Sequence, residues 1–282
     1  VFEIGMDRKG EIDYLSKIIK PDIGVITNIS YAHAKNFKSL FDIAKAKSEI
    51  IFNIRKNGTI ILNKDDKFFD FFSNVANKNN LNIISFGKHK NSIIRLSKLK
   101  KSENSCSIYI NVASKIYNFK INNNLLPYLD NILASIAVCK GLDITDEIDS
   151  SFFSNYKIPS GRGNIKNIIV GSKKVHIIDE SYNSNPLSLN FSIKKFDNLK
   201  VNPNKKFMLL GDMLELGKFS KKLHIEAAKE INKAKFKKLF VYGEYIIDTF
   251  NKIRTQKRGK ILKSTDDIHN FIKNDLNNGD FL

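Results

Sequence analysis

The chain has 282 residues, of which 42% are hydrophobic and 27% charged; this allows two domains with buried cores and excludes disorder or a single mini-domain. Its two cysteines, Cys106 and Cys139, lie far apart, and no apolar run approaches the roughly 20 residues that cross a bilayer, so we expect a protein without disulfides in the cytoplasm. The 47 Lys and Arg exceed the 29 Asp and Glu, and the resulting charge of +18 favours anionic partners such as nucleic acid, nucleotides or acidic sugars.

Residues 1–158 are predicted to form the first domain, a mostly parallel sheet with an antiparallel addition. The apolar run at 23–29 follows a helix that Pro21 ends, which is typical of a βαβ unit whose strand is buried on both faces. Ser39 and Asp42 resemble a capping box at the start of the next helix. The elements expected in chain order are a strand at 1–4, a helix at 11–19, a strand at 23–29, a helix from 40 to about 54, strands at 59–62 and 82–86, antiparallel segments near 92–97 and 106–120, and a helix at 130–140 with Gly141 at its end.

Residues 159–282 are predicted to form a second, Rossmann-like α/β domain, because strands and helices alternate strictly there. We place the boundary near residues 150–163, where polar sequence ends in KIPSGRGN. The expected strands are 174–178, 206–211, 238–242 and 260–262, and the expected helices are 187–197, 221–234, 244–254 and 265–275.

Three residues of the first domain have side chains that their surroundings do not explain. Glu3 interrupts an apolar strand; a buried carboxylate needs a partner or a cation, and an exposed edge residue explains the pattern equally well. His33 follows a predicted strand and has the chemistry to bind a metal or a phosphate, although a loop histidine with an ordinary hydrogen bond is the more common case. Lys47 falls on the apolar face of its helix, where it either extends its ammonium group to water or has a special role.

In the second domain, polar residues follow the strand that ends at Asp179. Asn185 is a plausible N-cap with Pro186 at the first helical position, so the free N–H groups of this helix start could bind phosphate. An ordinary strand-to-helix connection would explain the same pattern. Arg162 lies between two glycines in PSGRGN, and a second polar loop, GDMLELG, follows the strand at 206–211.

Taken in order, these segments resemble the Mur ligase family, the ATP-dependent amide-forming enzymes of bacterial cell-wall synthesis. The combination of SYNSNP with GDMLELG is typical of the branch that adds D-alanyl-D-alanine. The motifs that carry the resemblance are EIGM with GEI, TNISYAH, AKAKSEI, PSGR, DESYNSNP, and GDMLELG with His224 beyond it.

The resemblance implies a central ATP-binding domain followed by a Rossmann-like C-terminal domain, with ATP and Mg²⁺ as cofactors. It also implies UDP-N-acetylmuramoyl-tripeptide and D-alanyl-D-alanine as partners of a monomeric enzyme that forms an acyl phosphate. Glu3, His33 and Lys47 match metal-site positions, where the lysine is carbamylated, and Lys47 and His33 count as catalytic. The nucleotide contacts implied are Asn131 with adenine, Arg162 with phosphate, Glu180 with ribose, and Asn185. Tyr182, Asn183, Glu215 and His224 belong to family motifs without an assigned role.

The chain also departs from the family pattern. Asp130 and Ala134 replace the usual His and Asn around Asn131, and Glu180 replaces an Asp. The phosphate-binding loop G-T-x-G-K-T, the domain that holds the UDP-sugar and a KGSR-like segment do not occur in the 282 residues, so we expect a fragment that does not turn over ATP alone. Alternatives are a sibling ligase, a relative resembling folylpolyglutamate synthase and, more distantly, a basic nucleic-acid-binding protein; spread-out lysines favour compositional bias over the last.

Overall fold

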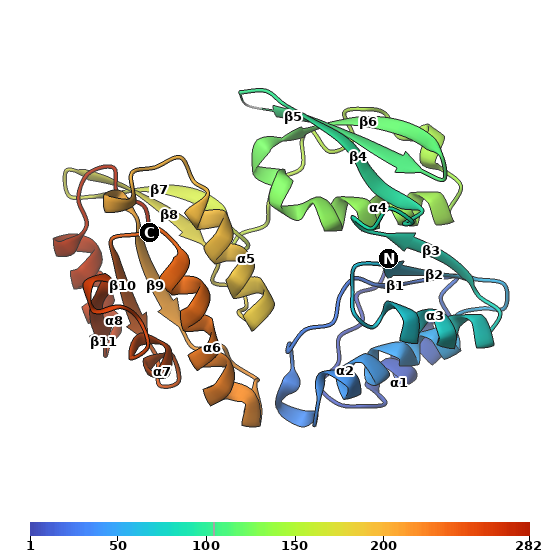
Figure 1. Ribbon diagram of the computed structural model, residues 1–282, viewed down its shortest axis with the longest axis horizontal. Helices are drawn as coiled ribbons and strands as arrows, with labels where there is room; N and C mark the ends of the chain where they lie inside the picture. Colours follow the sequence, from blue (N-terminus) through green and yellow to red (C-terminus); the bar gives the residue numbers. More distant parts are fainter. Residues whose placement is uncertain (104) are drawn as a thin grey trace. The chain divides into compact units, whose positions relative to one another are not determined.

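The computed structural model describes residues 1–103 and 105–282, which form two compact units (Figure 1). The first unit comprises residues 1–29 and 36–157, and the second comprises residues 30–35 and 158–282. Within the described residues, no helix is long and apolar enough to span a membrane.

The first unit is built on one six-stranded sheet with the order β1-β2-β3-β4-β5-β6. Strands β1 to β4 are parallel, whereas β4, β5 and β6 are antiparallel, as expected for an antiparallel addition. Its elements are α1 (Glu11–Ile19), β1 (Ile23–Ile26), α2 (Leu40–Lys47), β2 (Thr59–Asn63), α3 (Phe69–Lys78), β3 (Asn82–Phe86), β4 (Ile94–Lys101), β5 (Ser105–Val112), β6 (Lys115–Asn122) and α4 (Leu129–Gly141).

Helices cover the two halves of this sheet differently. Helix α3 contacts β2 and β3, and α4 contacts β1 to β4, so the parallel strands are covered by helices and their side chains are largely buried. Strand β5 instead alternates strictly between buried and half-buried residues, because α4 lies on one side of β4–β6 only (Figure 1). One face of the antiparallel half is therefore open.

Several predicted elements of the first unit need correction. Residues 1–4 are not a strand: they form no ladder with a neighbouring strand, and the side chains of Val1 and Phe2 are exposed. Strand β1 ends at Ile26 instead of residue 29, because side chains bind the following backbone: Asn63 donates to the Thr27 carbonyl, and the Asp66 carboxylate accepts from Ile29 N–H.

Two helices also differ from their predicted form. The helix expected to reach about Ile54 continues after α2 as a 3₁₀ segment, Ser48–Asn53, and its Ser39 cap accepts from Asp42 N–H as expected. Gly141 is the last residue of α4, and the left-handed residue after the helix is Asp143. Helix α3 was not predicted.

The second unit contains a three-stranded parallel sheet, β11-β10-β9, and an antiparallel hairpin of β7 and β8. Phe281 bridges the two, because it pairs with His176 of β8 and with Lys206 next to β9. The elements are β7 (Asn164–Val170), β8 (Lys173–Asp179), α5 (Pro186–Asp197), β9 (Phe207–Gly211), α6 (Ser220–Lys233), β10 (Lys238–Tyr242), α7 (Ile246–Phe250), β11 (Arg258–Leu262) and α8 (Thr265–Asn270).

The predicted alternation holds from β8 to α8, with three corrections. Strand β7 was not expected, and it makes β8 antiparallel to its partner. The helix predicted at 244–254 is only the short α7, and the one at 265–275 consists of α8 followed by a π-helical turn, Phe271–Asp275. The core between the sheet and α5, α6 and α7 is formed by large apolar side chains such as Leu189, Ile193, Leu239 and Ile246.

Candidate functional site

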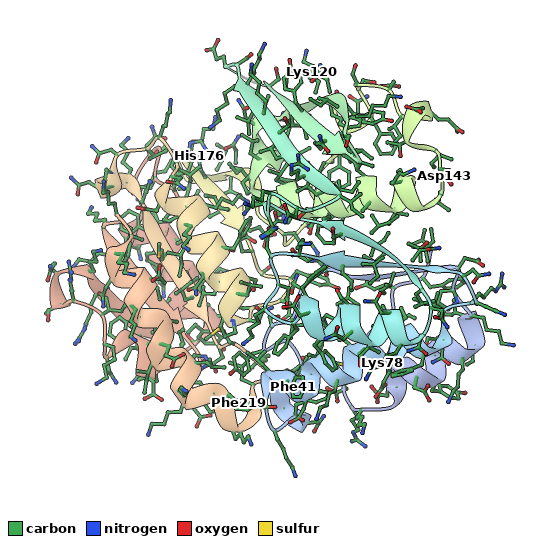
Figure 2. The ribbon with its side chains drawn as sticks, turned by 45° about the vertical axis from the view of Figure 1, so that its right-hand side comes forward. Phe41, Lys78, Lys120, Asp143, His176 and Phe219 are labelled. Atoms are coloured by element: carbon green, nitrogen blue, oxygen red, sulfur yellow. The ribbon has the colours of Figure 1, made fainter. Side chains whose placement is uncertain are left out.

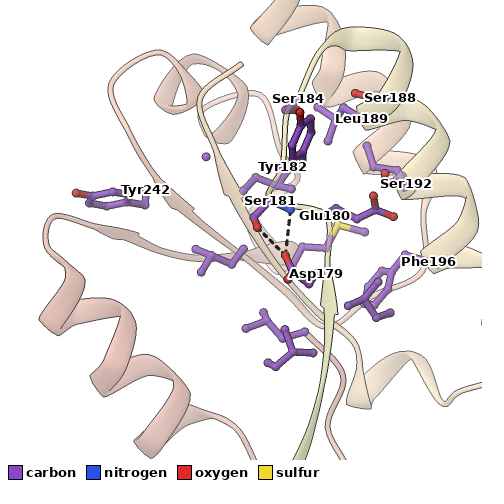
Figure 3. A pocket seen from close by; sticks show the side chains of 18 of the residues that line it. Asp179, Glu180, Ser181, Tyr182, Ser184, Ser188, Leu189, Ser192, Phe196 and Tyr242 are labelled. Atoms are coloured by element: carbon purple, nitrogen blue, oxygen red, sulfur yellow. Dashed lines mark hydrogen bonds between the residues drawn. The ribbon is translucent and has the colours of Figure 1, made fainter. Parts of the chain in front are cut away.

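A pocket of about 570 Å³ opens in the second unit where β8 and β9 end (Figure 3). Its floor is apolar, with Leu189 and Phe196 of α5, and its rim is polar, with Asp179, Glu180 and Ser184. The carboxyl ends of strands in open α/β sheets are the usual place for ligands, and the volume is that of a small-molecule site.

Asp179 ends β8 and is held by two groups. Its Oδ2 accepts from Lys166 Nζ at 2.8 Å, and its Oδ1 accepts from the Ser181 hydroxyl at 2.6 Å (Figure 3). The hydrogen bonds from Lys166 and then from Ser181 lower the pKa of Asp179 to about 2, so the carboxylate is charged at neutral pH. Lys166 extends from β7, which shows why the hairpin matters for the site.

Glu180 lines the same pocket and has its own cation. The Lys195 Nζ of α5 lies 3.3 Å from Glu180 Oε1 and donates to the Gly163 carbonyl at 3.0 Å. The Lys195 side chain is only 13% exposed. The Lys195 ammonium group therefore joins the Glu180 carboxylate to the turn formed by residues 161–163, which we call the glycine turn.

Arg162 belongs to this glycine turn, which packs against the loop after β8. The guanidinium lies over the Tyr182 ring, with Cζ 4.2 Å from the ring centre, and Tyr182 N–H donates to the Gly161 carbonyl at 3.1 Å. Gly161 has a φ of +76°, and a Cβ there would lie 3.0 Å from the Tyr182 Cβ. Glycine is thus required for both the backbone conformation and the close approach.

Asn185 caps α5 as the sequence predicted. Its Oδ1 accepts from Leu187 N–H at 3.0 Å and from Ser188 N–H at 3.1 Å, while the Ser188 hydroxyl accepts from Asn185 N–H to complete a capping box. The amide oxygen of Asn185 is therefore used by the helix, and neither Asn185 nor Arg162 lines the pocket.

His224 of α6 is fully buried, and it holds the GDMLELG loop by a hydrogen bond from the loop backbone. His224 Nε2 accepts from Met213 N–H at 3.0 Å, so the ring proton is on Nδ1, which donates to the Ser220 carbonyl at 2.8 Å. His224 therefore positions the loop, and it does not line the pocket.

His33 and Glu215 meet in the second unit, to which residues 30–35 belong. His33 Nδ1 lies 2.5 Å from Glu215 Oε2, and Lys35 N–H donates to the Glu215 carbonyl at 2.7 Å. Both His33 and Glu215 have positive φ, at 54° and 61°, a conformation that non-glycine residues adopt only when their surroundings stabilise it. The predicted metal-ligand candidate thus has a carboxylate partner 182 positions away.

Lys47 lies in the first unit, at the end of α2. Its Nζ donates to the Asn28 carbonyl at 3.3 Å, and its side chain is half-buried. Burial lowers the pKa of Lys47, and the nearby Asp66 carboxylate opposes this only in part. The amine is therefore easier to deprotonate than that of a solvated lysine.

The remaining candidates of the first unit, Glu3 and Asn131, are both exposed. Among the residues that the structure describes, no group of three or more His, Cys, Asp or Glu side chains is arranged to hold a metal ion. The residues that sequence reasoning missed are Lys166 and Lys195. A signal for Lys195 existed, because α5 was predicted and Lys195 lies on it, whereas Lys166 lies on the unpredicted β7.

Comparisons with known proteins agree with this architecture. Residues 1–139 match the Mur ligase middle domain, and residues 166–282 match the Mur ligase glutamate ligase domain. A UDP-N-acetylmuramoyl-tripeptide--D-alanyl-D-alanine ligase of Rickettsia prowazekii is 29% identical over 95% of the chain, and one of Buchnera aphidicola subsp. Baizongia pistaciae is 32% identical over 99%. The chain spans 59% and 58% of these two relatives.

Solved structures confirm the α/β fold class. MurF ligase from Thermotoga maritima, in complex with ADP, has a TM-score of 0.80 at 25% identity; the match covers 99% of this chain and 61% of that one. MurF from Acinetobacter baumannii has a TM-score of 0.82 at 23% identity, covering 96% and 57%.

Proposed function

The chain belongs to the Mur ligase family, and on that premise we propose that it is part of an ATP-dependent ligase that joins D-alanyl-D-alanine to UDP-N-acetylmuramoyl-tripeptide in peptidoglycan synthesis. The observation that carries the proposal is that two relatives bearing this name align with 95% and 99% of the chain at 29% and 32% identity. The chain corresponds to about three fifths of their length, so the complete gene product is the active species proposed.

The reaction implied by the family has two steps. The γ-phosphoryl group of ATP passes to the terminal carboxylate of the tripeptide, which gives ADP and an acyl phosphate. The amine of D-alanyl-D-alanine then attacks the acyl carbon, an amide bond forms, and phosphate leaves with the carboxylate oxygen. The protein contributes chiefly by positioning the groups and by offsetting charge.

We assign nucleotide binding to Asn131, Arg162, Glu180 and Asn185. The geometry that supports Arg162 and Glu180 is that Arg162 lies in the glycine turn and over the Tyr182 ring, while Lys195 joins this turn to Glu180. The ADP in the Thermotoga maritima relative supports nucleotide binding in this fold. Because the Asn185 oxygen caps α5, a nucleotide contact at this residue would come from its NH₂ group or from its backbone.

We assign Mg²⁺ binding to Glu3, His33 and Lys47, with Lys47 and His33 as catalytic-site residues. An ammonium group is no ligand for Mg²⁺, so Lys47 fits this role as a carbamate, whose oxygens are the ligands this ion prefers. Half-burial and the lowered pKa support that modification, because only a neutral amine attacks CO₂. When bound, Mg²⁺ offsets negative charge on the phosphates.

Phosphate release by the complete gene product tests the proposal. Release is expected only when ATP, UDP-N-acetylmuramoyl-tripeptide and D-alanyl-D-alanine are all present. Full release without the dipeptide, or with a single amino acid in its place, would show a sibling activity or an ATPase instead. Glutamate with a folate acceptor gives the control for a folylpolyglutamate synthase-like enzyme. The expected cytoplasmic location and monomeric state stay predictions.

A further inference from the structure

The antiparallel half of the first unit presents one face on the side opposite α4, which we call the outer basic face. Because side chains alternate along a strand, the register of β4, β5 and β6 assigns residues to this face in rows that run across the three strands. The rows are Arg95–Asn111–Ile116, Lys98–Tyr109–Asn118 and Lys100–Ser107–Lys120.

No helix covers these rows. The alternate rows carry the fully buried Ile108, Ile110 and Phe119, and α4 lies on their side of the strands (Figure 1). Lys98, Lys100 and Lys120 are exposed, and Lys120 lies at the outer surface in Figure 2. The outer basic face is therefore free in the part of the chain that the structure describes.

The charge on this face has one sign. Arg95, Lys98, Lys100 and Lys120 contribute four cations, and the three rows contain no carboxylate. Glu103 follows the end of β4 and belongs to none of the rows. The nearest lysine of an alternate row, Lys115, differs in that it pairs with Asp146. Cations gathered along neighbouring strands with no carboxylate among them attract an anion that is itself extended.

We propose that the outer basic face binds single-stranded nucleic acid. Tyr109 lies at its centre, half-buried, with Lys100 Nζ 5.6 Å from the ring centre, so a π-face and a cation are offered at one place. Asn111 and Asn118 flank it with amide groups that can bond to base edges. Rows of cations, an aromatic side chain for stacking and polar amides are the groups with which proteins hold single strands.

The same residues disfavour a lipid surface as the occupant. Membrane-binding faces combine cations with several large apolar side chains that enter the interface, whereas Ile116 is the sole large aliphatic residue in these rows. The proposal uses no residue of the ligase site and does not depend on that function.

Fluorescence anisotropy of a labelled 20-nucleotide poly(U) strand with the 282-residue chain tests the proposal. If the four cations neutralise phosphates, the logarithm of the binding constant should fall with log salt at a slope of about −3. The variant K98E/K100E/K120E should lose at least tenfold in affinity at low salt and most of this slope. A matched control, K221E/K229E/K235E, changes the net charge equally at exposed sites of the second unit and should lose less than threefold.

Two further arms make the result decisive. Tyr109→Leu should weaken poly(U) binding by about fivefold or more while leaving the salt slope unchanged, because stacking is lost and the charges remain. Circular dichroism of every variant checks that β4–β6 still fold. Equal losses in the two triple variants, or undiminished binding to Tyr109→Leu, would overturn the proposal. Tighter binding to anionic phosphatidylglycerol vesicles than to poly(U), with displacement of the poly(U) strand, would also overturn the proposal.

Discussion

Specific partners hold the candidate site residues: Glu215 lies beside His33, Lys195 beside Glu180, and the Asn28 carbonyl accepts from Lys47. Lys47 is a candidate because a cation on the apolar face of a helix is unexpected, and the helical period alone places it there. The partners of His33 and Glu180 could not be predicted from the sequence, because only the folded chain brings Glu215 and Lys195 close to them. The sequence pattern identifies a residue in an unusual position, and the contacts made in the folded protein determine its role.

Replacing Lys47 tests the expected carbamate. Lys47→Ala should abolish ligase activity of the complete gene product, and added bicarbonate should not restore it, because no amine remains to react with CO₂. The matched control is Lys45→Ala on the same helix: Lys45 is exposed, lies over the Phe41 ring and should be dispensable. Carbon-13 NMR with labelled bicarbonate should show a carbamate signal in the parent and in Lys45→Ala only. Activity above a tenth of the parent in Lys47→Ala would contradict the assignment.

The bond between Lys166 and Asp179 predicts a pH-dependent stability. The folded pKa of Asp179, about 2, lies below the usual value of 3.8, so the bond stabilises the fold above about pH 4 and its contribution is lost as the pH falls towards 2. Lys166→Met should lower the free energy of unfolding at pH 7 by about 1–2 kcal/mol, and the difference should shrink below pH 4.

Urea unfolding at a series of pH values measures this difference. Lys174→Met, an exposed position on the neighbouring strand β8, is the control and should change little at any pH. A loss in Lys166→Met that stays constant from pH 7 to pH 3 would show that Lys166 contributes by packing and not through the carboxylate.

At the scale of elements, the sequence predicted what local signals determine. The structure confirms Asn185 as the N-cap of α5 and Pro186 as its first residue, because both signals are local in the sequence. Helix α3 was missed because Phe68 offers no side-chain cap to mark its start. Strand β7 was missed because Ile165, Ile168 and Ile169 do not alternate with a period of two: their spacing of i, i+3 and i+4 is that of a helix, and Ile165 and Ile169 are exposed. Its place depends on pairing with β8.

Substitution of Asn185 separates helix capping from nucleotide binding. Asn185→Ala should destabilise the protein by about 1 kcal/mol in chemical denaturation, since two N–H groups lose their acceptor, and Asn185→Ser should restore most of this. If the side chain also contacts ATP, Asn185→Ser should keep the stability and still raise the KM for ATP. An unchanged KM in both variants would leave Asn185 as a cap alone and remove it from the nucleotide site.

At the scale of the whole molecule, the order of the domains identifies the family, whereas the net charge does not. The two Mur ligase domains occur in sequence over nearly the entire chain, and this order identifies the family without reference to the charge of +18. The basic residues are spread over both units, and four of the 47 lie on the outer basic face, for which we propose a separate binding function.

The central claim is that the complete gene product forms an amide through an acyl phosphate. Mass spectrometry of a reaction with UDP-N-acetylmuramoyl-tripeptide labelled with ¹⁸O in its terminal carboxylate tests it most directly. We predict a product equal to tripeptide plus D-alanyl-D-alanine minus water, with one ¹⁸O atom transferred to the released phosphate. Released phosphate without ¹⁸O, or phosphate release with unchanged tripeptide, would contradict the account.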